Sequence, residues 1–164
     1  MPKARFFGDS AAVKTNDNKE EISMKKQINI DKNTSHLAGE FLVAGELSRR
    51  GYPVSITMGN AKSIDILADS EKGVIKIDAK AGRAKGNWPI NGDLINKNMY
   101  YIFVYLQTFN EIERNKAPEF FIVSGGEILK KKLITRWKTR EGIKYSDLNN
   151  NKYRERWDKL PASK

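Results

Sequence analysis

The sequence predicts an α/β domain whose mixed central sheet is flanked by helices. Three observations support this fold class. Apolar residues recur at helical spacing after Thr34, alternating apolar residues mark three short segments between residues 53 and 80, and a continuous apolar and aromatic segment fills residues 99–106. The 164 residues suffice for one core. We therefore expect a single domain at 34–164, with its core at 36–123 and basic C-terminal helices at 124–164.

The first 33 residues are polar and show no sustained apolar period, so we expect a poorly ordered N-terminal arm. A helix follows. Its predicted apolar face holds Leu37, Phe41, Ala44 and Leu47, with Asn33 or Thr34 as N-cap and Gly51 as the C-terminal stop.

Alternating residues at 53–58, 63–68 and 74–80 predict three strands in an antiparallel meander. Residues 81–98 are basic and rich in turn-forming residues. The segment 99–106 predicts a strand buried on both faces, and 120–123 a further strand. Ser124 to Glu127 is a capping box that opens a predicted helix with Leu129, Leu133 and Trp137 on one face, and a last short helix is expected after Ser146, burying Leu148, Tyr153 and Trp157.

Composition limits the functional classes. The chain has 30 basic and 20 acidic residues, a net charge of +10 and a pI near 9.7, a balance that favours polyanionic partners. Cysteine is absent, which excludes disulfides and thiolate metal sites, and the single histidine excludes zinc sites with two or three histidines from one chain. A metal would therefore be a hard ion bound mainly by oxygen. We expect no membrane span and no secretory signal, hence a cytoplasmic protein.

Two acidic residues stand at unusual positions. Glu40 falls within the apolar stripe of the predicted helix, where it either reaches solvent at the edge of the stripe or meets a cation or a polar cleft. Asp65 lies inside the predicted strand 63–68, although aspartate is a poor strand former. The short turn that follows places Asp65 opposite Ile77 or Asp78, and the sequence leaves the register open between the two.

Asp78 and Lys80 are two residues apart on the next strand, so they share the face that points away from Ile75, Ile77 and Ala79. Two carboxylates on neighbouring strands repel each other unless a cation lies between them. An oxygen-only pair suits Mg²⁺, with Mn²⁺ as an alternative. A lysine on the same face can hold the attacking water or the phosphate that is cleaved.

The order Glu40, Asp65 and then Asp78-Ala79-Lys80 resembles the PD-(D/E)xK nuclease superfamily, in particular its Holliday-junction-resolvase-like and homing-endonuclease-like members. The resemblance covers about residues 36–123 and implies a restriction-endonuclease-like sheet. It also implies that Asp65, Asp78 and the Ala79 carbonyl are metal ligands, that Lys80 is catalytic, and that Glu40 is an acid of the metal site.

The sequence departs from this superfamily in three places. Asp78 replaces the commoner glutamate, Ile64 stands where proline is usual, and residues 81–98 are too rich in turns for the full helix that normally joins the third and fourth strands.

Several residues are expected to contact nucleic acid. Arg83, Lys85 and Trp88 follow Lys80 in a glycine-containing loop, where they could bind phosphates and stack on a base; in the alternative interpretation, Trp88 caps the core. His36 is expected to be structural or a phosphate contact. A second basic cluster suited to the DNA backbone is formed by Lys130, Lys131, Lys132 and Arg136, together with Lys138 and Arg140.

These observations predict a Mg²⁺-dependent DNA endonuclease that hydrolyses phosphodiester bonds, and cutting both strands would favour a homodimer. The first alternative is an inactive nuclease fold that serves as a DNA-binding or protein-interaction module, suggested by Asp78. A basic RNA-binding domain is a third interpretation, and the aromatic signature of such domains is absent.

Overall fold

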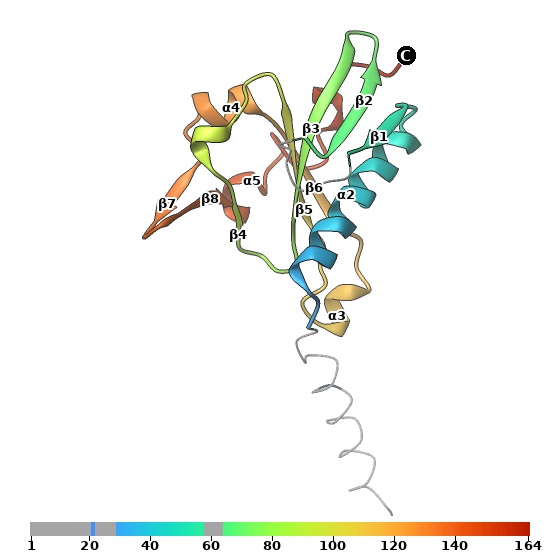
Figure 1. Cartoon of the computed structure of the whole chain (residues 1–164). Coiled ribbons are helices and arrows are strands. Elements are labelled where there is room, and N and C mark those ends of the chain that lie inside the picture. Colours follow the sequence, from blue (N-terminus) through green and yellow to red (C-terminus); the bar gives the residue numbers. More distant parts are fainter. Residues whose placement is uncertain (1–20, 22–28, 58–63) are drawn as a thin grey trace, which may run out of the picture.

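A computed structural model describes residue 21 and residues 29–57 and 64–164 (Figure 1). Most of the predicted arm, residues 1–20 and 22–28, lies outside the described residues. The centre of the molecule is a five-stranded sheet in the order β1-β2-β3-β5-β6. Its strands are β1 (Val54–Ile56), β2 (Ile66–Ser70), β3 (Gly73–Gly82), β5 (Tyr100–Tyr105) and β6 (Glu119–Ser124). Only the β3–β5 pair is parallel, so the sheet is mixed, as the sequence predicts.

Helix α2 (Lys32–Arg49) covers one face of this sheet (Figure 1). It begins earlier than predicted because the N-cap is Asp31, whose carboxylate accepts hydrogen bonds from the N–H groups of Asn33 and Thr34 at 2.9 and 3.2 Å. The end agrees with the prediction, since Gly51 takes the left-handed conformation (φ +89°) just after the cap. Residues 31–33 therefore belong to the folded domain and not to the arm.

The buried face of α2 agrees with the predicted one only in part, because Ala44 and Leu47 are buried as predicted and the other two residues are not. Leu37 and Phe41 are 44% and 51% exposed, and the face against the sheet instead consists of Ser35, Gly39, Val43, Ala44 and Leu47. Close approach of the backbones explains the difference. A Cβ added at Gly39 would lie 2.4 Å from Cβ of Ala81, so only small residues fit there.

Side chains alternate across the sheet into two hydrophobic clusters. Ile77, Ala79 and Ile102 belong to the cluster beneath α2, whereas Tyr101 and Phe103 point into the opposite cluster. Strand β5 is buried on both faces, which confirms the prediction for residues 99–106.

A second sheet covers the opposite face, with the strand order β4-β8-β7. It consists of β4 (Asn87–Pro89), β7 (Thr135–Trp137) and β8 (Arg140–Lys144). The predicted basic helices at 124–164 are therefore wrong in large part. The capping box is present, because Ser124 and Glu127 exchange hydrogen bonds, but α4 spans only Gly125–Lys130. Lys132 then takes a left-handed conformation (φ 50°), which ends the helix and turns the chain into the β7–β8 hairpin.

The remaining elements are short. Helices α3 (Glu111–Arg114) and α5 (Tyr145–Leu148) have four residues each, and 3₁₀ turns span Gly92–Leu94 and Trp157–Lys159. Residues 81–98 lack a full helix, as predicted. The expected burial of Leu148, Tyr153 and Trp157 is observed without a long helix. Within the described ranges, no helix is both long and apolar enough to cross a membrane.

Candidate active site

Strand β3 extends beyond its partner β2, and this offset creates the candidate site. Ile77 pairs with Ile66, the first residue of β2, while β3 continues to Gly82. Asp65 precedes Ile66, so it stands level with Asp78, which resolves the register that the sequence left open. The Asp65 carboxylate takes the place of the missing strand: its Oδ2 accepts a hydrogen bond from the Ala79 N–H at 2.8 Å. This bond holds the carboxylate against the free edge of β3.

Asp78 is buried beside this edge, with 7% exposure. Burial raises the pKa of its carboxyl group from 3.8 to about 6, against the lowering effect of the Lys80 ammonium, and Asp65 raises it further. Lys80 Nζ forms an ion pair with Asp78 Oδ1. The predicted pair thus shares one face and lies in direct contact.

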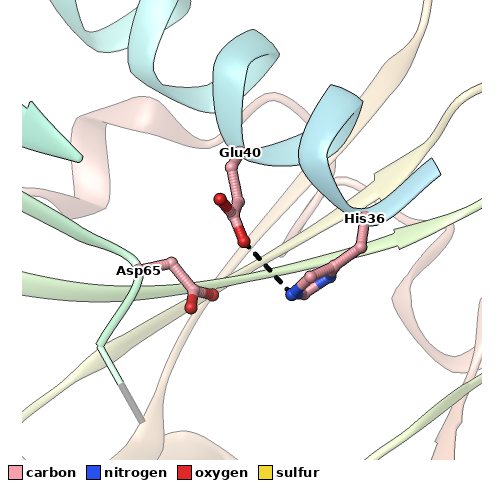
Figure 2. A group of neighbouring side chains, drawn as sticks. All are labelled: His36, Glu40 and Asp65. Carbon is pink, nitrogen blue, oxygen red and sulfur yellow. Dashed lines mark ion pairs between the residues drawn. The ribbon is translucent and has the colours of Figure 1, made fainter. Parts of the chain in front are cut away.

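Glu40 extends from α2 toward Asp65 (Figure 2). Its side chain is 13% exposed, so it does not extend into solvent from the edge of the helix. Burial is the main cause of a raised pKa, and the nearby Asp65 carboxylate raises it further, while His36 and Lys80 lower it. Asp65 and Lys80 therefore affect the pKa of both Glu40 and Asp78, which links the four residues predicted to act together.

His36 is an additional member of the cluster. Its Nε2 lies 3.1 Å from Glu40 Oε1, and one ligand atom each from His36, Glu40 and Asp65 lie within 4.8 Å of one another (Figure 2). The sequence indicated only a structural or phosphate-binding role for His36. Its spacing from Glu40, four residues on one helix, places both side chains on the same face and was the available signal.

An open cleft of about 890 Å³ leads to Asp78 and Lys80. One wall is the edge of the central sheet, the other the second sheet and its neighbouring turn. Its lining residues include Lys32, Tyr101, Asn91, Ile95 and Arg140. Asp78 and Lys80 thus border this cleft, although most of Asp78 is covered.

The two basic residues of the loop after β3, which were predicted to bind phosphates, have different surroundings. Lys85 is exposed, with its ammonium 5.5 Å from the centre of the Tyr145 ring. Arg83 donates hydrogen bonds to the carbonyl groups of Ile30 and Thr108 at 3.2 and 3.4 Å, and so joins the start of α2 to the sheet.

The contacts of Trp88 contradict the prediction that its ring stacks on a base. It is 3% exposed, its ring packs against Phe103 and Phe121, and its Nε1 donates to the Val104 carbonyl at 3.3 Å. Both its faces and its polar atom are occupied inside the protein. The alternative interpretation, a tryptophan that caps the core, agrees with these contacts.

The second basic cluster is exposed and distributed over two elements. Lys130 and Lys131 lie at the end of α4, where Lys131 contacts Glu127 and the Tyr153 ring. Lys132 and Arg136 instead border a hollow beside the second sheet. Arg136 is 75% exposed and forms an ion pair with Glu141.

Comparison with known proteins gives a match in structure only. No protein-family model matches this chain, and no curated protein matches it. The fold is similar to that of a bacterial homing endonuclease, I-Ssp6803I, with a TM-score of 0.52 and 12% sequence identity over 78% of this chain and 90% of that one. The chain therefore has a nuclease-like fold. At this identity, the comparison concerns the arrangement of the elements and not the side chains.

Proposed function

We propose that this protein is a metal-dependent endodeoxyribonuclease of the PD-(D/E)xK type, which hydrolyses phosphodiester bonds of DNA in the cleft beside β3. The observation that carries the proposal is the convergence of Glu40, Asp65, Asp78 and Lys80 on the exposed edge of one strand. The homing-endonuclease-like fold supports it, as does the net charge of +10, which favours a polyanionic substrate.

The side chains fit a hard divalent cation. Three carboxylates gather here, and Asp65 raises the pKa of both Glu40 and Asp78, although the Lys80 ammonium already pairs with Asp78. Asp65 and Asp78 would hold Mg²⁺ or Mn²⁺, with the Ala79 carbonyl as a third ligand and Glu40 completing the acidic group. A bound ion supplies positive charge to the phosphate and increases the acidity of water.

Lys80 has a separate task in this proposal. The ion pair with Asp78 holds its ammonium at the base of the cleft, where it can donate hydrogen bonds to a phosphate oxygen or to the attacking water. Such a donor stabilises the negative charge that develops at the phosphate during hydrolysis. Lys32 and Arg140 border the same cleft and can neutralise neighbouring phosphates.

Digestion of supercoiled plasmid, branched DNA and single-stranded DNA with Mg²⁺ or Mn²⁺ tests the proposal. We expect metal-dependent cleavage of at least one form and none in excess EDTA. A linear plasmid product formed without a nicked intermediate would indicate that two copies act together, as in a homodimer. If every substrate remains intact with both metals, the protein is not a deoxyribonuclease.

The second candidate function is a DNA-binding or protein-interaction module that has lost catalysis. The observation that favours it is the direct Lys80 contact with the short Asp78 side chain, which replaces the longer glutamate of related nucleases. Calorimetric titration with Mn²⁺ separates the two functions. The enzyme binds the ion in a manner that Asp78→Asn removes, whereas the module shows no such binding.

A further inference from the structure

The β7–β8 hairpin forms a narrow ribbon that projects from the body of the molecule, at the left of Figure 1. Trp137 pairs with Arg140, so the turn consists of Lys138 and Thr139 alone. Lys138 takes a left-handed conformation (φ 51°), and both turn residues are exposed. A two-stranded ribbon of this kind has the width that the major groove of DNA accepts.

The ribbon is strongly basic. Residues 132–144 contain five basic residues and one acidic residue, Glu141. Glu141 does not cancel the charge at the tip, because its carboxylate accepts the Gly92 N–H at 2.9 Å and pairs with Arg136 nearer the base. The acidic residue therefore attaches the hairpin to the turn beside the cleft, while Lys138 and Arg140 remain exposed.

The hollow beneath the ribbon is continuous with the cleft. Arg136, Lys138 and Thr139 line a hollow of about 490 Å³, which shares Ile90, Asn91 and Glu141 with the cleft of Asp78 and Lys80. Arg140 lies on the wall of the cleft itself. One surface channel thus leads from the candidate catalytic residues to the tip of the hairpin.

From this channel we infer that the β7–β8 hairpin inserts into the major groove of duplex DNA and fixes which phosphate enters the cleft. The inference rests on the proposed function and names its substrate as a duplex with an accessible major groove. Lys138 stands in the turn at the tip of the hairpin, and Arg140 follows it at the start of β8, on the wall of the cleft.

A duplex with a blocked major groove tests this inference. Two duplexes of one sequence are compared, one with glucosylated 5-hydroxymethylcytosine in place of cytosine, and binding is measured by fluorescence anisotropy with Mg²⁺. The full-length protein carries Lys80→Ala in all arms so that the DNA stays intact. We expect on the order of tenfold weaker binding to the blocked duplex.

Adding Arg136→Gln and Lys138→Asn should remove this preference, leaving less than about a twofold difference between the duplexes. Asparagine tolerates the left-handed turn, so the hairpin keeps its shape. The control Lys72→Asn, in the distant β2–β3 turn, removes one positive charge and should retain the preference. Equal binding of both duplexes by the parent protein, or a preference that survives the hairpin substitutions, would overturn the inference. A parent protein that binds neither duplex would also overturn the inference, and the digestion of plasmid, branched and single-stranded DNA then decides the proposed function separately.

Discussion

Asp78 combines two properties that oppose each other, burial and the ability to carry a negative charge. Its carboxyl group holds a proton more tightly in the folded chain than in the unfolded chain, because burial raises the pKa to about 6. The contribution of Asp78 to stability is thus greatest below about pH 4 and declines as the pH rises through 6. At neutral pH, the fold maintains a costly carboxylate at the site where a cation would compensate for it.

We predict that Asp78→Asn stabilises the metal-free protein at pH 8 by about 1–3 kcal/mol, with a smaller gain at pH 4.5. Urea denaturation in EDTA at both pH values measures this. Asp69→Asn is a matched control on the half-exposed face of β2, where loss of the Lys164 ion pair should change stability by less than about 0.5 kcal/mol. A substitution at Asp78 that lowers stability at pH 8 would show that the buried charge is already compensated.

The same pKa predicts how Mn²⁺ binding depends on pH. Protons compete with the ion for the Asp78 carboxylate, so affinity should rise about tenfold per pH unit below 6 and level off above about pH 7. Calorimetric titration between pH 5 and 8 measures the dependence. An affinity that is constant over this range would remove Asp78 from the ligand set.

Lys80 is the residue whose loss should separate cleavage from binding. We predict that Lys80→Ala lowers the cleavage rate at least about a hundredfold, because a donor to the reacting phosphate is lost. Affinity for DNA should change less than about threefold. The control Lys76→Ala removes an exposed lysine from the same face of β3 and should keep full activity. Equal rates for both variants would exclude a catalytic role for Lys80.

At the scale of elements, the contact between α2 and β3 positions His36 and Glu40. Gly39 lies between them in the helix, and a methyl group there would meet Ala81 at 2.4 Å. Gly45 lies in the same helix with nothing within 4 Å of an added Cβ. Replacing these two glycines by alanine should therefore have opposite effects on stability. At Gly39 the added methyl group meets the neighbouring strand, whereas at Gly45 it changes only the helix propensity.

We predict that Gly39→Ala destabilises the protein by about 1–3 kcal/mol and weakens Mn²⁺ binding, because α2 must move away from the strand that carries Asp78. Gly45→Ala should stabilise by about 0.5–1 kcal/mol and leave metal binding unchanged. Denaturation and calorimetry of both variants check this. If Gly39→Ala binds Mn²⁺ as tightly as the wild type, α2 does not set the geometry of the site.

At the scale of the whole molecule, the last described residues join distant elements. Trp157 packs on Phe120 with ring centres 5.3 Å apart, and the Arg50 guanidinium lies 4.2 Å from its ring. Further along, the Pro161 carbonyl accepts a hydrogen bond from the Tyr52 hydroxyl at 2.6 Å. Through these contacts, the C-terminal segment connects the end of α2 to the sheet.

Trp157→Ala should accordingly cost about 3–5 kcal/mol, the range for removing a buried aromatic side chain. Val74→Ala, at a position with 60% exposure, should cost less than about 1 kcal/mol. Denaturant unfolding of the two variants provides the comparison. Similar losses for both would mean that Trp157 contributes little to the core.

Short-range periodicity explains what could be predicted from the sequence. The spacing of two in a strand places Asp78 and Lys80 on one face, and the spacing of four in a helix places His36 beside Glu40. The strands at 74–80, 99–106 and 120–123 also follow from local patterns. Each of these depends only on residues that are neighbours along the chain.

Contacts between distant segments decided the rest. The register that brings Asp65 level with Asp78 depends on the pairing of β2 with β3, and the burial of Trp88 depends on its contacts with Phe103 and Phe121. The helix predicted from Ser124, with Leu129, Leu133 and Trp137 on one face, ends at Lys130. The chain then forms a hairpin, because β8 pairs with β4, where Gly142 permits the approach of Trp88. The amino-acid sequence thus determined which residues form the candidate site and which face of its helix or strand each one occupies. Packing determined that these residues come together, because buried contacts join segments that lie far apart in the sequence and that local spacing cannot relate.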